Sequence, residues 1–352
     1  PAEEEIKKHE EIIDEAERLR QKLAMLKKKM QKKALPTRGF EEKKVLQEEE
    51  LPVIFHLPFE TVAGDNSIYS SVGNARAKLI NLYSDSLEDS IEGKGIHIKG
   101  GGFVLIDGSY AKGVDKELTL SFWIKANKLS DCVILEKGVL RIDLHQNKLR
   151  AYLTIQPSNS LMTEIQKGRW YAIAVTFNSF TGDMKLYVNG VRKQQLNINA
   201  DMSMFRGDFY IGKGAESRKS TFDGVFDEFK LYSKELTEEQ LVIKKPFNIE
   251  VKLAGTGKTH SRVVTLELFA DNATQFMAYE TGYKKEARWE NMREKKLIIL
   301  SETSGKKEIQ CIFRSWLGVE SKVFTLYVEY EKDDQRVKLY APNEGALVTG
   351  KR

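Results

Sequence analysis

Residues 169–190, RWYAIAVTFNSFTGDMKLYVNG, carry the pattern of two neighbouring strands and decide the fold class. An apolar alternating run spans residues 172–177, and a polar turn over 178–183 separates it from a second run at 184–188. Alternation with a period of two is typical of a half-buried strand. Asn189 and Gly190 follow, and they favour a type I′ turn because both central residues of that turn need positive φ. The segment therefore predicts antiparallel β-structure with a tight hairpin at its end.

Short strand-like runs separated by turns continue on both sides of this segment. Such spacing indicates a β-sandwich, which we place at residues 51–244. The predicted strands cover residues 53–57, 95–98, 103–106, 118–125, 132–136, 140–144, 148–154, 170–177, 185–188, 209–211 and 224–231. We expect Trp123, Trp170, Phe177 and Tyr187 to lie near the core of this sandwich.

Several phrases in this region resemble the laminin-G-like, concanavalin A-like jelly-roll domains, and they occur in that family's order. They are LPVIFHLPFE, GKGIHIKGGGFVLI, ELTLSFWIKA, the WYAIAVTF and KLYVNG pair, DFYIGKG and FDGVFDEFKLYSKELTEEQL. The resemblance implies a two-sheet jelly roll over residues 51–244. In the last phrase, Thr237 and Gln240 form a capping-box pattern that predicts a short helix.

A second β unit is predicted at residues 246–331, where six to seven alternating runs are typical of an immunoglobulin-like sandwich. The phrases LELFADNATQFMAYETGYKKEARWE and GKKEIQCIFRSWLGVES resemble small bacterial and phage Ig-like modules, although residues 314–318 replace the turn those modules usually have. Residues 332–352 are predicted to be a polar C-terminal tail, and residues 34–50, with Pro36 and Gly39, a linker.

The N-terminal residues 1–33 are predicted to form a coiled-coil helix, because strong helix formers dominate and Gly is absent. Apolar residues recur with a 4-3-4-3-4 spacing, as in a coiled-coil seam. The seam consists of Ile12, Ala16, Leu19, Leu23, Leu26 and Met30. It predicts a homo-oligomer, with a trimer favoured over a dimer because no Asn occupies a seam position. The predicted fold class is therefore mostly β, with an N-terminal helix, a jelly roll and an Ig-like sandwich.

Composition narrows the classes of partner. The 352 residues carry a net charge of +5 with Lys and Glu interleaved, which argues against nucleic acid binding. No run of 18 apolar residues exists, so no membrane insertion is predicted. Cys132 and Cys311 lie in apolar runs and are interpreted as buried free thiols. The first residues lack the apolar core of a signal peptide, so we expect synthesis in a cytoplasm without conventional export.

No catalytic motif stands out, and we predict a protein that is not an enzyme. The five histidines form no HExxH pair, and neither a GxSxG elbow nor a Walker phosphate loop is present. A glycosidase on this fold needs two neighbouring carboxylates. Asp227 and Glu228 are adjacent in a predicted strand, so their side chains should point to opposite faces.

A structural calcium ion is the one cofactor that the family resemblance implies. In the laminin-G-like pattern the Asp of the "I-D-E" phrase is a ligand, and Asp227 matches it here. Glu60 and Asp65 follow the first predicted strand, where the family has further oxygen ligands, which suit Ca²⁺. The alternative is that Asp227 only caps a strand end. Glycan binding would need exposed aromatic rings, for which Tyr69, Tyr110, Phe180 and Phe205 are the candidates.

These features lead to three hypotheses for function. The first is a structural and adhesive virion protein, a head fibre, tail fibre or decoration protein of a tailed phage, with other virion proteins and host-surface glycans as partners. It would be made in the host cytoplasm and carried on the particle. The second is a secreted bacterial carbohydrate-binding protein or adhesin, located outside the cell or on its surface. The third is an accessory chain of a glycoside hydrolase.

Overall fold

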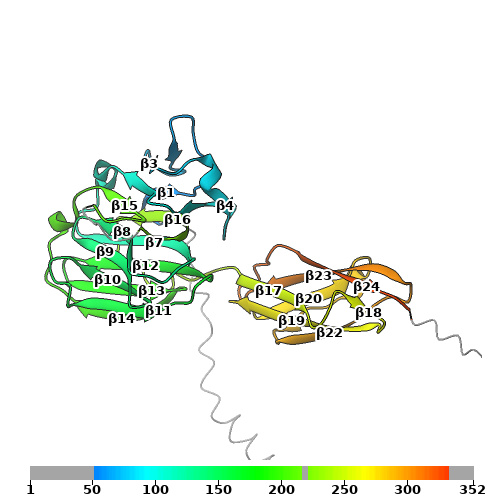
Figure 1. Cartoon of the computed structure of the whole chain (residues 1–352). Helices are drawn as coiled ribbons and strands as arrows, with labels where there is room; N and C mark the ends of the chain where they lie inside the picture. The colour runs from blue at the N-terminus through cyan, green and yellow to red at the C-terminus, as the bar shows by residue number, and fades with distance from the viewer. Residues whose placement is uncertain (1–50, 216–220, 333–352) are drawn as a thin grey trace, which may run out of the picture. The chain divides into compact units, whose positions relative to one another are not determined.

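The computed structural model describes residues 51–215 and 221–332, and these residues are built from β-strands (Figure 1). The short connecting turns include four 3-10 helices, η2 (Ser84–Ser86), η3 (Gly108–Ala111), η4 (Met202–Phe205) and η5 (Lys284–Glu286). Within the described ranges there is no α-helix, and no helix there is long and apolar enough to cross a membrane.

The predicted fold class, with a helical segment beside the β domains, is therefore wrong, since the described chain is all β. The coiled-coil seam from Ile12 to Met30 lies outside the described residues. The short helix expected after Thr237 is also absent. Gln240 Oε1 does accept a hydrogen bond from Thr237 N (3.0 Å), as in a capping box, but residues 238–241 close only one turn.

The first sheet of the jelly roll, sheet A, is antiparallel and contains both strands of residues 169–190. In spatial order it consists of β14 (Val191–Asn197), β13 (Asp183–Val188), β12 (Trp170–Asn178), β7 (Glu117–Ala126), β16 (Gly224–Tyr232), β5 (Lys94–Ile98) and β4 (Leu87–Asp89), with β1 (Val53–Leu57) also paired to β16.

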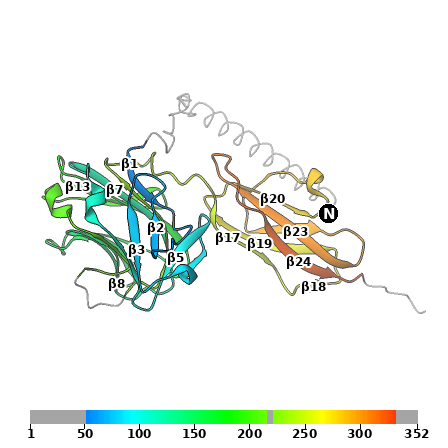
Figure 2. The same ribbon diagram turned by 90° about the horizontal axis from the view of Figure 1, so that it is seen from above.

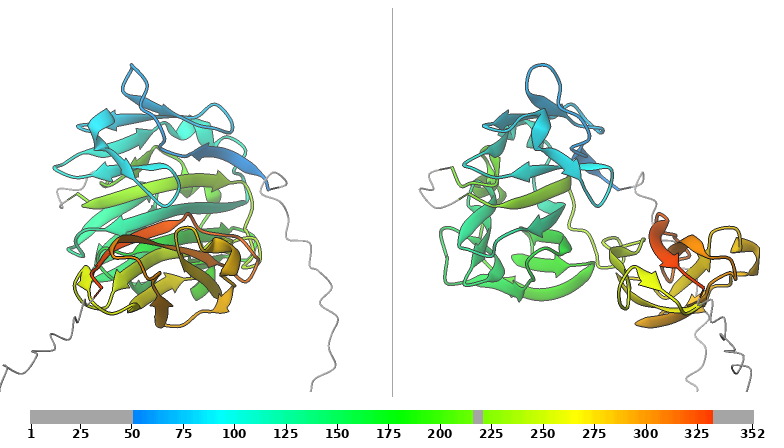
Figure 3. Two further views of the ribbon diagram at one scale, coloured as in Figure 1. Left: turned by 90° about the vertical axis from the view of Figure 1, so that its right-hand side faces the viewer. Right: turned by 45° about the vertical axis from the view of Figure 1, so that its right-hand side comes forward.

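Sheet B faces sheet A and completes the jelly roll (Figure 3). In spatial order it consists of β11 (Ser160–Glu164), β10 (Lys148–Leu153), β9 (Leu140–His145), β8 (Cys132–Lys137), β15 (Phe209–Ile211), β6 (Phe103–Ile106), β3 (Arg76–Ile80) and β2 (Ser67–Tyr69).

The hairpin at Asn189 and Gly190 is confirmed. Both residues have positive φ, +55° and +78°, and they join β13 to β14 with Val188 opposite Val191. This is the backbone that a type I′ turn requires. The turn therefore fixes the position of β14, whose own residues are almost all exposed.

The core between the two sheets is rich in phenylalanine. Phe55 from sheet A lies edge-to-face against Phe209 from sheet B, with ring centres 5.5 Å apart. Phe122 stacks on Phe226 at 4.8 Å, and Phe177 stacks on Phe205 at 4.7 Å. Aromatic contacts of this kind stabilise a core beyond the area they bury.

The prediction that four aromatic residues lie near the core is wrong for two of them. Phe177 is fully buried between the sheets, but Trp123 and Trp170 are only half-buried. The reason is parity, because side chains alternate along a strand and Trp170 is an odd number of residues from Phe177. Tyr187 is buried, but it alternates with the core-facing Leu186 and does not belong to the main apolar cluster.

A second sandwich follows (Figure 2). Its three-stranded sheet orders β17 (Phe247–Leu253), β19 (Val263–Asp271) and β22 (Lys295–Ile299). Its five-stranded sheet orders β18 (Lys258–Thr259), β24 (Phe324–Tyr330), β23 (Gly305–Arg314), β20 (Gln275–Glu280) and β21 (Glu290–Asn291). This sandwich has its own apolar core, which contains Leu266, Phe276, Cys311 and Phe313. Its Ig-like assignment stays a prediction.

Candidate functional site

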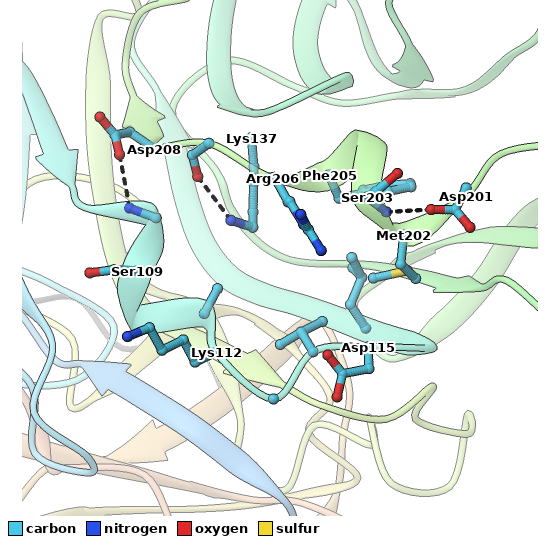
Figure 4. A pocket seen from close by; sticks show the side chains of 16 residues that line it. Ser109, Lys112, Asp115, Lys137, Asp201, Met202, Ser203, Phe205, Arg206 and Asp208 are labelled. Carbon is cyan, nitrogen blue, oxygen red and sulfur yellow. Dashed lines mark hydrogen bonds between the residues drawn. The ribbon is translucent and has the colours of Figure 1, made fainter.

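A cavity of about 600 Å³ lies among three loops of the jelly roll (Figure 4). Residues 108–115 form one wall between β6 and β7, and residues 201–208 form another between β14 and β15. Lys137, at the end of β8, forms the third. We call this cavity the loop pocket.

Aspartate caps shape two of these loops. Asp107 accepts a hydrogen bond from Ser109 N (2.8 Å) at the start of η3, and Asp201 accepts one from Ser203 N (2.7 Å) at the start of η4. A side-chain oxygen at such a position satisfies an amide that the short helix leaves unpaired. Asp208 then ties the loops together, because its Oδ1 accepts from Gly108 N at 2.8 Å.

Gly138 allows the β8–β9 turn to approach the 201–208 loop. Its φ is +55°, and a Cβ at this position would lie 2.5 Å from Met204 O and 2.6 Å from Arg206 O. The amide of the next residue, Val139, donates to Met204 O at 3.1 Å. Only glycine combines this backbone conformation with so close an approach.

Lys137 is a buried cation at the pocket wall. Its Nζ donates a hydrogen bond to Gly207 O (3.1 Å) and lies 3.8 Å from the centre of the Phe209 ring. The cation therefore has a carbonyl and an aromatic face as partners. Burial lowers the pKa of the Lys137 ammonium to about 8.

The charged side chains around the pocket balance one another. Cations and carboxylates occur in equal number, namely Lys112, Lys137 and Arg206 against Asp115, Asp201 and Asp208. Within the described part of the chain, Lys112, Asp115 and Arg206 make no side-chain hydrogen bond or ion pair. These three side chains are therefore available to a ligand.

The apolar part of the pocket lining includes Met202, Phe205 and Leu118. Phe205, one of the aromatic residues considered for glycan binding, is buried and serves as part of the core beneath the pocket. Tyr110 is partly buried and packs on the same core. Tyr69 and Phe180 are exposed, at 54% and 69% of their surface, and neither lines the loop pocket.

The structure places two of the three predicted calcium ligands near one turn. Asp227 is fully buried, and its carboxyl oxygens accept from Ser90 Oγ (2.7 Å) and Glu228 N (2.7 Å). Glu60 accepts from Lys94 N (3.1 Å), so both acids contact residues 90–94. Burial, with the nearby charge of Glu228 and Glu60, raises the pKa of Asp227 to about 8.

Asp65 lies apart from this pair. Its Oδ2 accepts from Tyr69 OH (2.9 Å) and pairs with Arg76 (3.2 Å). The hydrogen bond from Tyr69 is the largest of the effects that lower the pKa of Asp65. Across residues 51–215 and 221–332, no three His, Cys, Asp or Glu side chains are arranged to hold a metal ion. The calcium site stays a prediction.

Sequence reasoning did not identify the loop pocket. The signal that could have found it is a repeated Asp-x-Ser cap in two glycine-containing loops, DGSYAKGVD at 107–115 and DMSMFRGD at 201–208. Each stretch predicts an ordered turn that is followed in sequence by charged residues. That the two loops meet depends on strand order, since residue 108 and residue 208 belong to connections a hundred residues apart.

Comparison with known proteins supports the fold of this domain. Residues 100–242 match the family model of the concanavalin A-like lectin/glucanases superfamily. A search of curated protein sequences found no match.

The solved structures that are similar to this chain include members of two groups. One is domain 4 of AbnA, a GH43 extracellular arabinanase from Geobacillus stearothermophilus, solved with arabinotriose. It is 18% identical, covers 54% of this chain and 97% of its own, and gives a TM-score of 0.41. The receptor-binding domain of botulinum neurotoxin mosaic serotype C/D is 15% identical, with 78% and 72% covered and a TM-score of 0.46. The binding domain of botulinum neurotoxin DC in complex with SialylT is 13% identical, with 78% and 73% covered and a TM-score of 0.44.

The two facing antiparallel sheets, the Asn-Gly hairpin and the matched residues 100–242 agree on one assignment. The chain contains a concanavalin A-like jelly-roll domain.

Proposed function

We propose that the chain is a carbohydrate-binding protein and that the loop pocket binds its ligand without catalysis. The observation that carries this proposal is the balanced lining of the pocket, which contains three cations, three carboxylates and the apolar side chains of Met202, Phe205 and Leu118. The family model matched by residues 100–242, which describes lectins and glucanases, gives independent support.

A sugar ring suits this lining chemically. Each hydroxyl group both donates and accepts hydrogen bonds, so it needs acceptors and donors within the same cavity. Asp115 supplies acceptors, and Arg206 and Lys112 supply donors, without giving up an existing partner in the described chain. The C–H face of the ring can lie on Met202 and the other apolar groups.

Charge balance points to a neutral oligosaccharide as the ligand class. A pocket that selects an anionic ligand usually presents an excess of Arg and Lys. Here the carboxylates of Asp115, Asp201 and Asp208 offset the cations. An acidic sugar would gain attraction from Arg206 and lose a similar amount to the neighbouring aspartates.

The state of Asp201, one of the three pocket acids, supports binding without catalysis. Glycoside hydrolysis needs a carboxylic acid that is protonated near neutral pH. The hydrogen bonds from Ser203 lower the pKa of Asp201, so this group is a carboxylate. It is also occupied in capping η4.

A glycan array tests the proposal. We expect the full chain to bind neutral oligosaccharides, and Arg206→Gln and Asp115→Asn to weaken that binding. Lys193→Gln is the matched control, because it removes an equal charge from an exposed residue on β14 outside the pocket. The proposal fails if no glycan binds, or if the pocket variants bind as strongly as the control.

A further inference from the structure

Three side chains on the jelly roll form a continuous hydrogen-bonded series outside the loop pocket. Ser71 Oγ lies 2.8 Å from His56 Nδ1, and His56 Nε2 lies 3.0 Å from Glu228 Oε2. His56 comes from β1, Glu228 from β16, and Ser71 from the turn between β2 and β3. Three segments far apart in sequence thus place a hydroxyl, an imidazole and a carboxylate in order.

The partners of His56 indicate the role of each ring nitrogen. Glu228 forms an ion pair with Lys230 Nζ at 3.2 Å, so its side chain is a carboxylate. A carboxylate only accepts hydrogen bonds, so Nε2 carries the proton and donates it to Glu228. Nδ1 is then the acceptor for the Ser71 hydroxyl, as a general base must be.

Backbone bonds hold Ser71 and His56 at this separation. Ser71 N donates to His56 O (2.8 Å), and His56 N donates to the neighbouring Ser70 Oγ (2.9 Å). The two residues are therefore held together by one main-chain bond and by one bond to the Ser70 hydroxyl. This rigidity does not depend on the Ser71 hydroxyl itself, which belongs to an exposed residue.

Glu228 is aimed by an unusual backbone. Its φ is +53°, rare for a residue with a side chain, and β16 has an irregular register against β7 between Asp227 and Lys230. Such irregularities redirect a side chain that regular alternation would place elsewhere. Lys230 Nζ, 3.2 Å from Glu228 Oε2, shares the carboxylate with His56 and helps to hold it.

We propose that Ser71, His56 and Glu228 form an acyl-transfer site that hydrolyses unhindered carboxylic esters. Ser71 is the nucleophile, His56 the general base and acid, and Glu228 the residue that orients the imidazole. The arrangement of roles is that of a serine hydrolase triad, which is recognised by geometry and not by chain order. This activity is independent of glycan binding in the loop pocket, so either can fail alone.

The reaction balances without any other reactant than water. His56 Nδ1 takes the proton of Ser71 as Oγ bonds to the ester carbonyl carbon. The ester C–O bond breaks, and the imidazolium returns the proton to the leaving alkoxide, which departs as an alcohol. Water, deprotonated by His56, attacks the acyl-Ser71 ester. The carboxylic acid is released and Ser71 regains its hydrogen.

Acyl transfer at Ser71 requires nearby backbone amides that stabilise the oxyanion. Val72 N donates to Ser70 Oγ (3.3 Å) and Val72 bridges to His56 on β1, so this role would fall to the amides of residues 73–74. Such amides stabilise an oxyanion by donating hydrogen bonds to it. Ser71 lies on an exposed turn, so we expect small esters and a modest rate.

Two measurements on the full chain test the proposal. One is hydrolysis of p-nitrophenyl acetate, and the other is labelling by a fluorophosphonate, with the modified peptide identified by mass spectrometry. We expect the label on Ser71, and a loss of about a hundredfold in the rate for S71A and H56Q. E228Q should lose less, because it keeps the hydrogen bond and removes the charge. S158A is the matched control, an exposed serine without a histidine neighbour in the described chain.

The proposal is overturned if wild type hydrolyses the ester no faster than S71A, or if the label is on another residue. A structural role alone would leave both readouts unchanged. Should S71A fail to fold, S71C decides the question. Its thiol must react with iodoacetamide about tenfold faster when His56 is present than in the S71C/H56Q double variant, and equal rates would overturn the proposal.

Discussion

Ser90 Oγ donates a 2.7 Å hydrogen bond to Oδ2 of Asp227, a carboxyl group with no exposed surface. Burial is the main reason that the pKa of Asp227 rises to about 8. At neutral pH the folded chain therefore holds a proton on Asp227 that the unfolded chain releases, because an unfolded aspartate has a pKa of about 4.

This proton makes stability depend on pH. Between about pH 4 and pH 8 the native state binds one more proton than the unfolded state, so the free energy of unfolding falls as pH rises, by at most about 1.4 kcal/mol per unit. Asp227→Asn keeps an acceptor for Glu228 N and a donor for Ser90, and it should remove this fall. Urea unfolding at pH 5 and pH 8 measures it. Asp85→Asn, at an exposed site, is the control, and equal pH dependence in all three proteins would contradict the account.

Calcium at Asp227 would have to displace the same proton, because a metal ligand must be deprotonated. Any rise in melting temperature with calcium should then be larger at pH 8.5 than at pH 6, and absent in Asp227→Asn. Differential scanning fluorimetry with calcium and with a chelator makes the comparison. Equal melting of wild type in both solutions at both pH values would remove the calcium hypothesis.

Phe177 should contribute far more to stability than Trp170, despite the smaller ring. Phe177 is fully buried and stacked on Phe205, so Phe177→Ala should lower the free energy of unfolding by ~3–5 kcal/mol. Trp170 is half-buried on the opposite face of β12, where Lys125 lies over its ring. Trp170→Ala should therefore cost clearly less. Denaturant unfolding of both variants tests the order, and a larger loss for Trp170→Ala would place it in the core after all.

Gly138→Ala should disrupt the loop pocket. The new Cβ would meet the carbonyls of Met204 and Arg206 and sit at positive φ. Gly168→Ala is the control for conformation alone, with φ +75° and nothing within 4 Å of its Cβ. We expect about 1 kcal/mol of destabilisation for Gly168→Ala and about 2 kcal/mol more for Gly138→Ala. Equal losses, measured by thermal unfolding, would show that the close approach at Gly138 is not required.

The strands that sequence predicted were those with their own apolar pattern. β7, β12 and β16 were all expected, since each alternates and faces the core. β14 was missed because its residues are polar and exposed, and it is held by the Asn189-Gly190 turn and by pairing with β13. β2, β3 and β11 were also missed. They are short strands of sheet B, and β2 and β11 lie at its two edges, each paired with only one strand.

Candidate sites were harder to predict, because they depend on contacts between distant segments. The family resemblance pointed to Asp227, Glu60 and Asp65 as calcium ligands. Asp227 and Glu60 do contact the same turn, but Asp65 pairs with Arg76 instead. Ser71, His56 and Glu228 meet only because an irregular β16 redirects Glu228, which regular alternation does not foresee. The virion hypothesis rests on the order of predicted segments, and it stays a prediction.

The most direct test of carbohydrate binding in the loop pocket is isothermal titration calorimetry with the neutral oligosaccharide that gives the strongest array signal. Arg206 and Asp115 are the free donor and acceptor in the account, so wild type and Lys193→Gln should bind with equal affinity. Arg206→Gln should bind about tenfold more weakly, the loss expected when one hydrogen-bonding side chain with a charge is removed. Equal affinity for wild type and Arg206→Gln would contradict the placement of the ligand in this pocket.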